Sequence, residues 1–118
     1  MLTPRGCIIL CEKTEDGLGR LNKLRKTFDL PVIKMRWHNY YLPEKKFLNF
    51  ARKEFNVLDI NNIGSLYYII SRVVYAKLSS MKNKEPDYLN PINMIASNLP
   101  SIGNYSPNFV FFLQNKKQ

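Results

Sequence analysis

The sequence of 118 residues predicts one domain, spanning 1–118, of the mixed α/β class. Three short segments have the composition or the alternation of β-strands, and the segments between them carry apolar residues at helical spacing. With 45% hydrophobic residues, the chain has enough apolar mass for one modest core. No segment repeats another at a fixed period and none is of low complexity, so the order of the elements defines the class.

The first strand is expected over 7–11, a continuous apolar run that follows a turn at 2–6. A run without alternation is typical of a strand buried on both faces. The spacing of Cys7 and Cys11 places them on one face of the strand, and we expect both to be buried, reduced thiols. A zinc site would need further ligands, and the only histidine is His38, so no metal site is predicted.

Three amphipathic helices are expected, at 17–29, 43–54 and 66–79. Pro31 stops the first of them, and Ser65 can cap the third. The third helix should pack flat on a sheet, because it has a wide apolar stripe formed by Leu66, Ile69, Ile70, Val73, Val74 and Leu78.

The remaining segments complete the order of elements. A half-buried strand with period two is expected at 55–60, a short helix at 92–98 and a last strand at 108–113. The segment 31–42 has neither period and is expected to form an ordered loop. Right-handed crossovers would make the first two strands parallel, and the final strand could then join antiparallel.

The chain is strongly basic, with 18 lysines and arginines against 9 acidic residues and a net charge of +9. The favoured interpretation is a solvated basic surface, because these residues are spread over several segments; the other is attraction of an anionic partner. An anionic substrate would be indicated if five of them gathered near one rim, namely Arg5, Arg20, Lys23, Lys26 and Lys34.

No membrane span or targeting segment is expected. The run at 7–11 is too short for a signal-peptide core, and the longest apolar stretch, 66–78, is interrupted by Ser71 and Arg72. A cytoplasmic location is the default expectation.

Four stretches share a pattern with one enzyme family. Residues 2–10, LTPRGCIIL, resemble the "L-K-P-G-G" turn and fifth strand of class I S-adenosylmethionine-dependent methyltransferases, with Arg5 in place of the first glycine. Residues 35–42, MRWHNYYL, resemble the "W-H-N-x-Y-L" element of bacterial members, and 61–75 and 85–93 continue the resemblance.

The resemblance covers the later half of such an enzyme, from its fifth strand to its seventh. It implies part of a Rossmann-like fold, a three-stranded mixed sheet whose last strand lies antiparallel between the first two, flanked by helices. The glycine-rich turn and the acidic residue that bind the donor would precede this chain. S-adenosylmethionine is therefore expected to bind the complete family member and not this chain alone. Gly17-Leu18-Gly19 is interpreted as a helix-initiating turn.

Candidate site residues lie in the loop after the first strand. His38 is a candidate general base, because its unperturbed pKa lies near neutrality. Trp37, Asn39, Tyr40 and Tyr41 are candidate substrate contacts, with aromatic walls and an amide that donates and accepts. In the alternative, His38 and Asn39 hydrogen-bond the loop to itself and Trp37 fills the adjacent core.

Three functional hypotheses follow. The first is the substrate-side portion of a methyltransferase, inactive without its N-terminal donor-binding half. Its acceptor would be a small molecule or a saccharide, and an anionic one if the basic residues gather. The second is a basic α/β module that binds nucleic acid or another polyanion. The third is a chain without independent function, which would self-associate through its exposed first strand.

Overall fold

The computed structural model describes residues 3–36 and 40–116, and the described chain is of the mixed α/β class. The elements follow the expected order closely. In chain order they are β1 (Cys7–Lys13), α1 (Glu15–Thr27), α2 (Glu44–Glu54), β2 (Phe55–Asn62), α3 (Ser65–Ile69), η1 (Ile70–Val74), α4 (Tyr75–Met81), α5 (Pro91–Ala96) and β3 (Asn108–Asn115).

The three strands form one sheet in the order β1-β3-β2, and β3 runs antiparallel to both neighbours. This confirms the predicted position of the last strand between the first two. β1 and β2 run in the same direction but do not touch, so every pairing in the sheet is antiparallel. Ile9 of β1 and Asp59 of β2 both lie opposite Phe112, and a bulge at Leu58 interrupts the β2 register.

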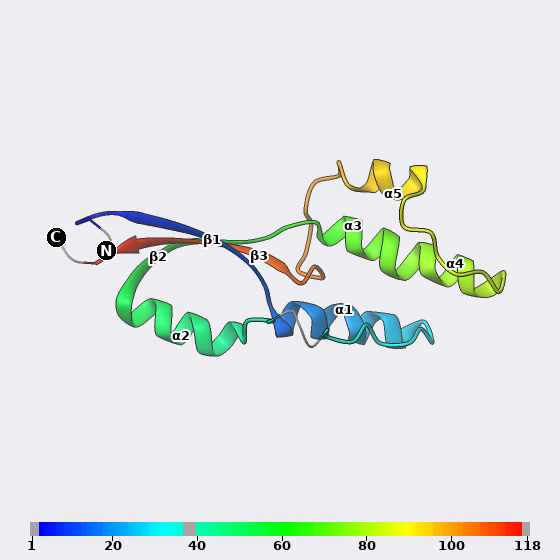
Figure 1. Cartoon of the computed structure of the whole chain (residues 1–118), viewed down its shortest axis with the longest axis horizontal. Coiled ribbons are helices and arrows are strands. Elements are labelled where there is room, and N and C mark those ends of the chain that lie inside the picture. The colour runs from blue at the N-terminus through cyan, green and yellow to red at the C-terminus, as the bar shows by residue number, and fades with distance from the viewer. Residues whose placement is uncertain (1–2, 37–39, 117–118) are drawn as a thin grey trace.

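One face of the sheet packs against α2 and forms the core there (Figure 1). Ala51 of α2 and Phe111 of β3 are fully buried, and Ala51 lets the helix approach the strands closely. The ring of Phe47 meets that of Phe111 edge-on, with 4.9 Å between centroids. Ile8 and Leu10 of β1 pack on the same side.

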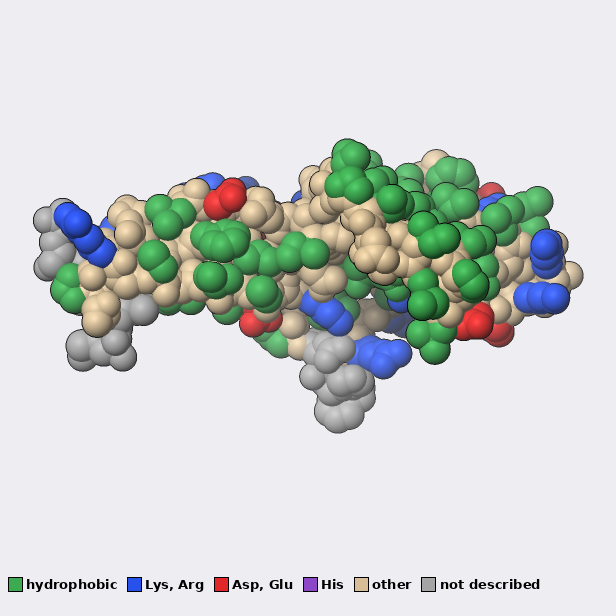
Figure 2. Space-filling view, turned by 90° about the horizontal axis from the view of Figure 1, so that it is seen from above, with side chains coloured by type: hydrophobic (Ala, Val, Ile, Leu, Met, Phe, Trp, Pro, Cys, Tyr) green, Lys and Arg blue, Asp and Glu red, His purple; other side chains and the backbone are tan. Residues whose placement is uncertain are grey.

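The opposite face of the sheet has no helix over it among the described residues, and this corrects the expected burial of β1 on both faces. Ile9 is 65% exposed, and Cys7 and Cys11 are exposed free thiols instead of buried ones. The apolar side chains form a patch when the molecule is seen from the side opposite α2 (Figure 2). A run of five apolar residues predicts a strand, but the number of faces of that strand that are buried depends on which other elements pack against it.

The remaining helices extend the molecule beyond the end of the sheet (Figure 1). The chain measures 59 × 26 × 24 Å, and its radius of gyration is 16.9 Å. A compact domain of this length would have a radius of about 13.5 Å. At the end of the molecule away from the sheet, α3, η1 and α4 form one long helix, which contacts α1 and α5.

The long helix does not pack flat on the sheet as predicted, because its neighbours are α1 and α5. The predicted apolar stripe of this helix is only partly confirmed. Val74 and Leu78 are about half exposed, at 50% and 51%. The buried positions include Ser71, Val73, Ala76 and Ser79. The π-turn η1 explains the difference. In it the N–H of Tyr75 donates to Ile70 O, and a turn closed by such an i to i−5 hydrogen bond shifts the residues at its end and beyond around the helix.

Candidate anion-binding site

The loop after α1 is fastened to that helix by two side chains. Asn22 forms a pair of hydrogen bonds with the backbone of Ile33, because its Nδ2 donates to Ile33 O at 2.9 Å and its Oδ1 accepts from Ile33 N at 2.7 Å. Arg25 Nε donates to Pro31 O at 2.9 Å. The described part of the loop, 31–36, is therefore held along α1 and forms a wall.

Arg25 also links α1 to the long helix. Its side chain is only 6% exposed, and its Nη1 donates to the carbonyl oxygen of Arg72 in η1. Burial lowers the pKa of Arg25 from its ordinary value; the side chain of Tyr88 opposes this and the charge of Arg72 adds to it. Arg25 thus fixes the backbone of η1 relative to the loop.

The Arg72 side chain lies among aromatic rings. Its guanidinium carbon is 3.6 Å from the centroid of the Tyr88 ring and 5.8 Å from those of Tyr67 and Tyr68. One of its nitrogens, Nη1, is buried with no hydrogen-bond partner among the described residues. An unpaired buried donor calls for an explanation, and π-turns such as η1 occur frequently at functional sites.

Arg72 and the loop border a cavity of about 460 Å³ between α1 and the long helix. Four of its lining residues are cations that come from β1, the loop and η1, and three are tyrosines. The lining consists of Lys13, Lys34, Arg36, Arg72, Tyr41, Tyr68, Tyr88, Leu18, Leu21, Ile33 and Pro107. None of these described residues is acidic. We call this space the cation–tyrosine cavity.

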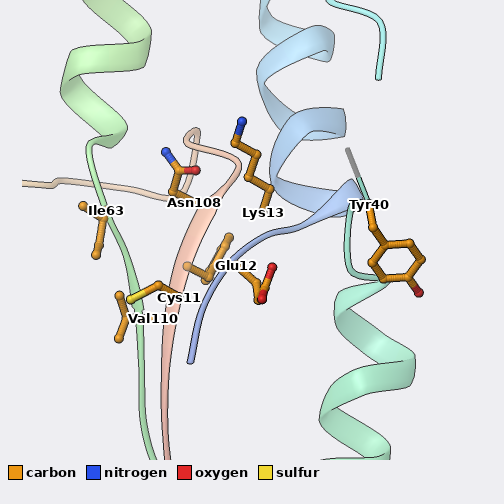
Figure 3. A pocket seen from close by; sticks show the side chains of 8 residues that line it. Cys11, Glu12, Lys13, Tyr40, Ile63, Asn108 and Val110 are labelled. Atoms are coloured by element: carbon orange, nitrogen blue, oxygen red, sulfur yellow. The ribbon is translucent and has the colours of Figure 1, made fainter. Parts of the chain in front are cut away.

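A second cavity, of about 600 Å³, also borders Lys13, and Figure 3 shows the residues that line it. It is lined by Cys11, Glu12, Lys13, Tyr40, Ile63, Asn108, Phe109 and Val110. In Figure 3, Tyr40 is separated by β1 from Ile63 and Val110. Because Glu12 is present, this cavity is less suited to an anion than the cation–tyrosine cavity. Lys13, at the carboxyl end of β1, lines both.

The structure separates two of the predicted substrate contacts. Tyr41 is 9% exposed and lines the cation–tyrosine cavity, where the Lys13 Nζ lies 5.8 Å from its ring centroid. Tyr40 is 75% exposed and lines the second cavity, so the two rings do not form one stacking wall. Trp37, His38 and Asn39 lie outside the described residues, between Arg36 and Tyr40.

The five basic residues that would have indicated an anionic substrate by gathering at one rim are not all brought together. Only Lys34 lines the cation–tyrosine cavity. Arg20 pairs with Glu44 at 3.2 Å and donates to Asn104 O, while Lys23 and Lys26 are exposed on α1. Arg5 precedes β1, at the opposite end of that strand from Lys13.

Sequence reasoning missed Arg72, Tyr68 and Tyr88 as site residues. A usable signal was present for Arg72, since this cation interrupts the middle of the apolar stretch 66–78. For Tyr88 the signal is tertiary only, because its segment reaches Arg72 through the turn that follows α4.

In the described part of the chain, 3–36 and 40–116, no group of three or more His, Cys, Asp or Glu side chains could hold a metal ion. No helix in these ranges has the length and apolar character that crossing a membrane requires. Comparison of the chain with protein-family models, with curated proteins and with solved structures gave no match.

Proposed function

We propose that this chain binds a small organic anion in the cation–tyrosine cavity, and that it does so as the acceptor-binding part of an S-adenosylmethionine-dependent methyltransferase. The observation that carries the first statement is the lining of that cavity, which has four cationic side chains and no acidic one among the described residues. The second statement is supported by the sequence resemblance.

The electrostatics favour an anion over a neutral ligand. Cations that converge on a concave site with protein walls focus the field there and raise the local concentration of anions. Lys34 and Arg36 come from the loop that Asn22 fastens to α1, so part of the charge is held in place before any ligand arrives. The anionic group of the ligand would be a phosphate or a carboxylate, which guanidinium and ammonium groups bind through charge-assisted hydrogen bonds.

The tyrosines suggest a ring in the same ligand. Tyr41, Tyr68 and Tyr88 offer aromatic faces and hydroxyl groups at the border of the cavity. A volume of about 460 Å³ is in the range of sites for small organic molecules. A planar or sugar ring that carries an anionic group fits these features together.

The methyl-transfer part of the proposal places the acceptor at the carboxyl end of β1, where Lys13 and Tyr41 lie. Open α/β sheets bind ligands at that edge. The antiparallel last strand between β1 and β2 agrees with the strand order that the resemblance implies. His38 as a general base stays a prediction, and positioning of the acceptor can supply much of the rate without a base.

The described residues do not fit the methyl donor. Gly17 faces the backbone before β3, since a Cβ there would lie 2.5 Å from Ser106 O and 2.9 Å from Pro107 Cα. It therefore serves close packing of α1, while Gly19 has no neighbour within 4 Å of a built Cβ. The donor would be held by a part of the enzyme outside these 118 residues, and we derive no step through it.

The test of the anion site uses p-nitrophenyl phosphate as a ring-bearing dianion and p-nitrophenol as the uncharged comparison, titrated calorimetrically. The double variant Lys34→Gln/Arg36→Gln should weaken binding of the phosphate by about tenfold, or about 1.4 kcal/mol, because it removes two cavity cations. The matched control is Lys45→Gln/Lys46→Gln, which removes the same charge from exposed positions on α2.

Three outcomes decide between the hypotheses. Selective loss in the cavity variant supports the anion site. Equal binding of p-nitrophenol would contradict it. Equal losses in both double variants, together with tight and salt-dependent binding of an oligonucleotide, would favour the polyanion-binding module instead.

A further inference from the structure

The outer edge of β1 offers unpaired backbone groups. At the two ends of its pairing with β3, backbone hydrogen bonds join Gly6 to Asn115 and Thr14 to Pro107. Because antiparallel residues alternate in the direction of their backbone groups, the even positions of β1 face β3 and the odd positions face outward. Lys13 confirms this, since its carbonyl accepts from Leu42 N on the outer side.

The outward positions before Lys13 are Cys7, Ile9 and Cys11, and no backbone hydrogen bond to their outer edge occurs among the described residues. The segment 7–11 contains no charge, proline or bulge, which are the devices that protect a strand edge from pairing. The side chains of the same three residues are exposed on the face without a helix, opposite to Ile8 and Leu10.

We infer that the chain forms a two-fold symmetric dimer in which β1 pairs antiparallel with β1 of a second copy, centred on Ile9. The sequence of this edge is complementary to itself in that register. Ile9 lies opposite Ile9 of the second copy, and Ile8 opposite Leu10, so apolar residues meet along the whole edge. The inference does not depend on the proposed function.

The limits of the pairing agree with the chain path. The backbone turns at Arg5, where φ is 60°, and Gly6 N donates to Thr3 O. Each strand therefore leaves the edge before it reaches the position opposite Lys13, which Leu42 already occupies. Pairing is confined to 7–11 on both copies.

This register places Cys7 of one copy opposite Cys11 of the other, twice in the dimer. Directly opposed, hydrogen-bonded residues of antiparallel strands have Cα atoms about 5.5 Å apart. Disulfides accept Cα separations of roughly 4.4 to 6.8 Å. Both thiols are exposed on the same face, so they are placed for cross-linking.

The edge alone buries less surface than the roughly 1,200 Å² of a stable interface, so the dimer is expected to exchange with monomer. Cross-linking of the full chain with diamide is therefore the suitable test. Two thiols form one S–S bond, and diamide takes up their two protons and two electrons. The wild-type chain should give a covalent dimer whose linked peptides contain Cys7 and Cys11.

The single variants Cys7→Ser and Cys11→Ser make the register testable. Neither variant alone can form the Cys7–Cys11 bond, whereas an equimolar mixture can form one bond per heterodimer. We expect several-fold more covalent dimer in the mixture than in either variant alone. Ile9→Pro removes an outward N–H that β3 does not use, and it should suppress cross-linking of the wild-type cysteines.

Efficient cross-linking of Cys7→Ser with itself would overturn this register, and so would a mixture that cross-links no better than its components. If a donor-binding half occupied this edge instead, adding that half would abolish the cross-link. If the 118-residue chain stayed monomeric at high concentration, a second copy would be excluded as the occupant of the edge.

Discussion

At the scale of single residues, two serines of the long helix show how partners decide the effect of a buried polar group. Ser65 and Ser71 are both fully buried. Ser65 Oγ accepts a hydrogen bond from Tyr105 N at 3.0 Å, which ties the loop before β3 to the helix start. Ser71 Oγ, in the π-turn, has no partner among the described residues.

Substitution of these two serines by alanine should therefore have opposite effects. Ser65→Ala should lower the free energy of unfolding by about 1–3 kcal/mol, because Tyr105 N–H is left unpaired. Ser71→Ala should leave it unchanged or raise it by up to about 1 kcal/mol, because an unsatisfied hydroxyl is removed.

Urea denaturation of both variants against wild type measures the difference. The two substitutions have the same volume change in the same helix, so each is the control of the other. A similar loss in both would mean that Ser71 Oγ has a partner that stabilises the fold.

Only some residues of the cation–tyrosine cavity could be predicted from the sequence. Tyr41 was selected from an aromatic cluster in the sequence, and it does line the cation–tyrosine cavity. Arg72 and Tyr88 were not selected, although their side chains stack at 3.6 Å. A local pattern identifies residues of one segment, but a site formed by β1, the loop, η1 and the turn after α4 is a property of their packing.

At the scale of elements, the start of α1 differs from its expected position. The helix begins at Glu15, two residues before the predicted Gly17, because Thr14 caps it with an Oγ1 that accepts from Gly17 N at 3.0 Å. Thr14 N also donates to Pro107 O, so the same residue ends β1 and holds the helix start against β3. Acidic residues in the first turn, Glu15 and Asp16, suit the helix dipole.

The two glycines of α1 should respond oppositely to alanine. Gly17→Ala should reduce the free energy of unfolding by about 1–3 kcal/mol, because its Cβ would overlap Ser106 O and force α1 away from β3. Gly19→Ala should raise it by about 0.5–1 kcal/mol, because Gly19 has open space and alanine favours the helix.

Thermal unfolding followed by circular dichroism at 222 nm, the standard helix signal, compares the two. Stabilisation by both substitutions would show that α1 is not seated against Ser106 and Pro107.

At the scale of the whole molecule, the chain has two ends with different packing. The sheet and α2 form the core around Phe111, and the long helix, α1 and α5 form the other end (Figure 1). The cation–tyrosine cavity lies where β1, α1 and the long helix meet. Binding of an anion there should therefore link the two ends, since Lys13 belongs to the sheet and Arg72 to the helices.

The 118-residue chain should also lack a binding site for the methyl donor. Isothermal titration of S-adenosylmethionine into the 118-residue chain should give no binding, because Gly17 is occupied by packing and no other glycine-rich turn follows a strand in the described ranges. A polypeptide that adds the glycine-rich turn and acidic residue of a donor-binding half should bind it.

Binding of the donor by the 118-residue chain would contradict our assignment of Gly17. Failure of the extended polypeptide to bind would refute the methyltransferase proposal and leave the anion site to be judged by its own titration.

The α/β class, the number and order of the strands and the approximate limits of the helices could be predicted from the sequence, because these depend on hydrophobic periods within single segments. Tertiary structure alone decided which faces are covered. It left Ile9, Cys7 and Cys11 exposed, turned Val74 outward at the end of the π-turn, and brought Lys13, Lys34, Arg36 and Arg72 to one cavity. The physical reason is that burial and charge convergence depend on which elements pack together, and a local period does not contain that information.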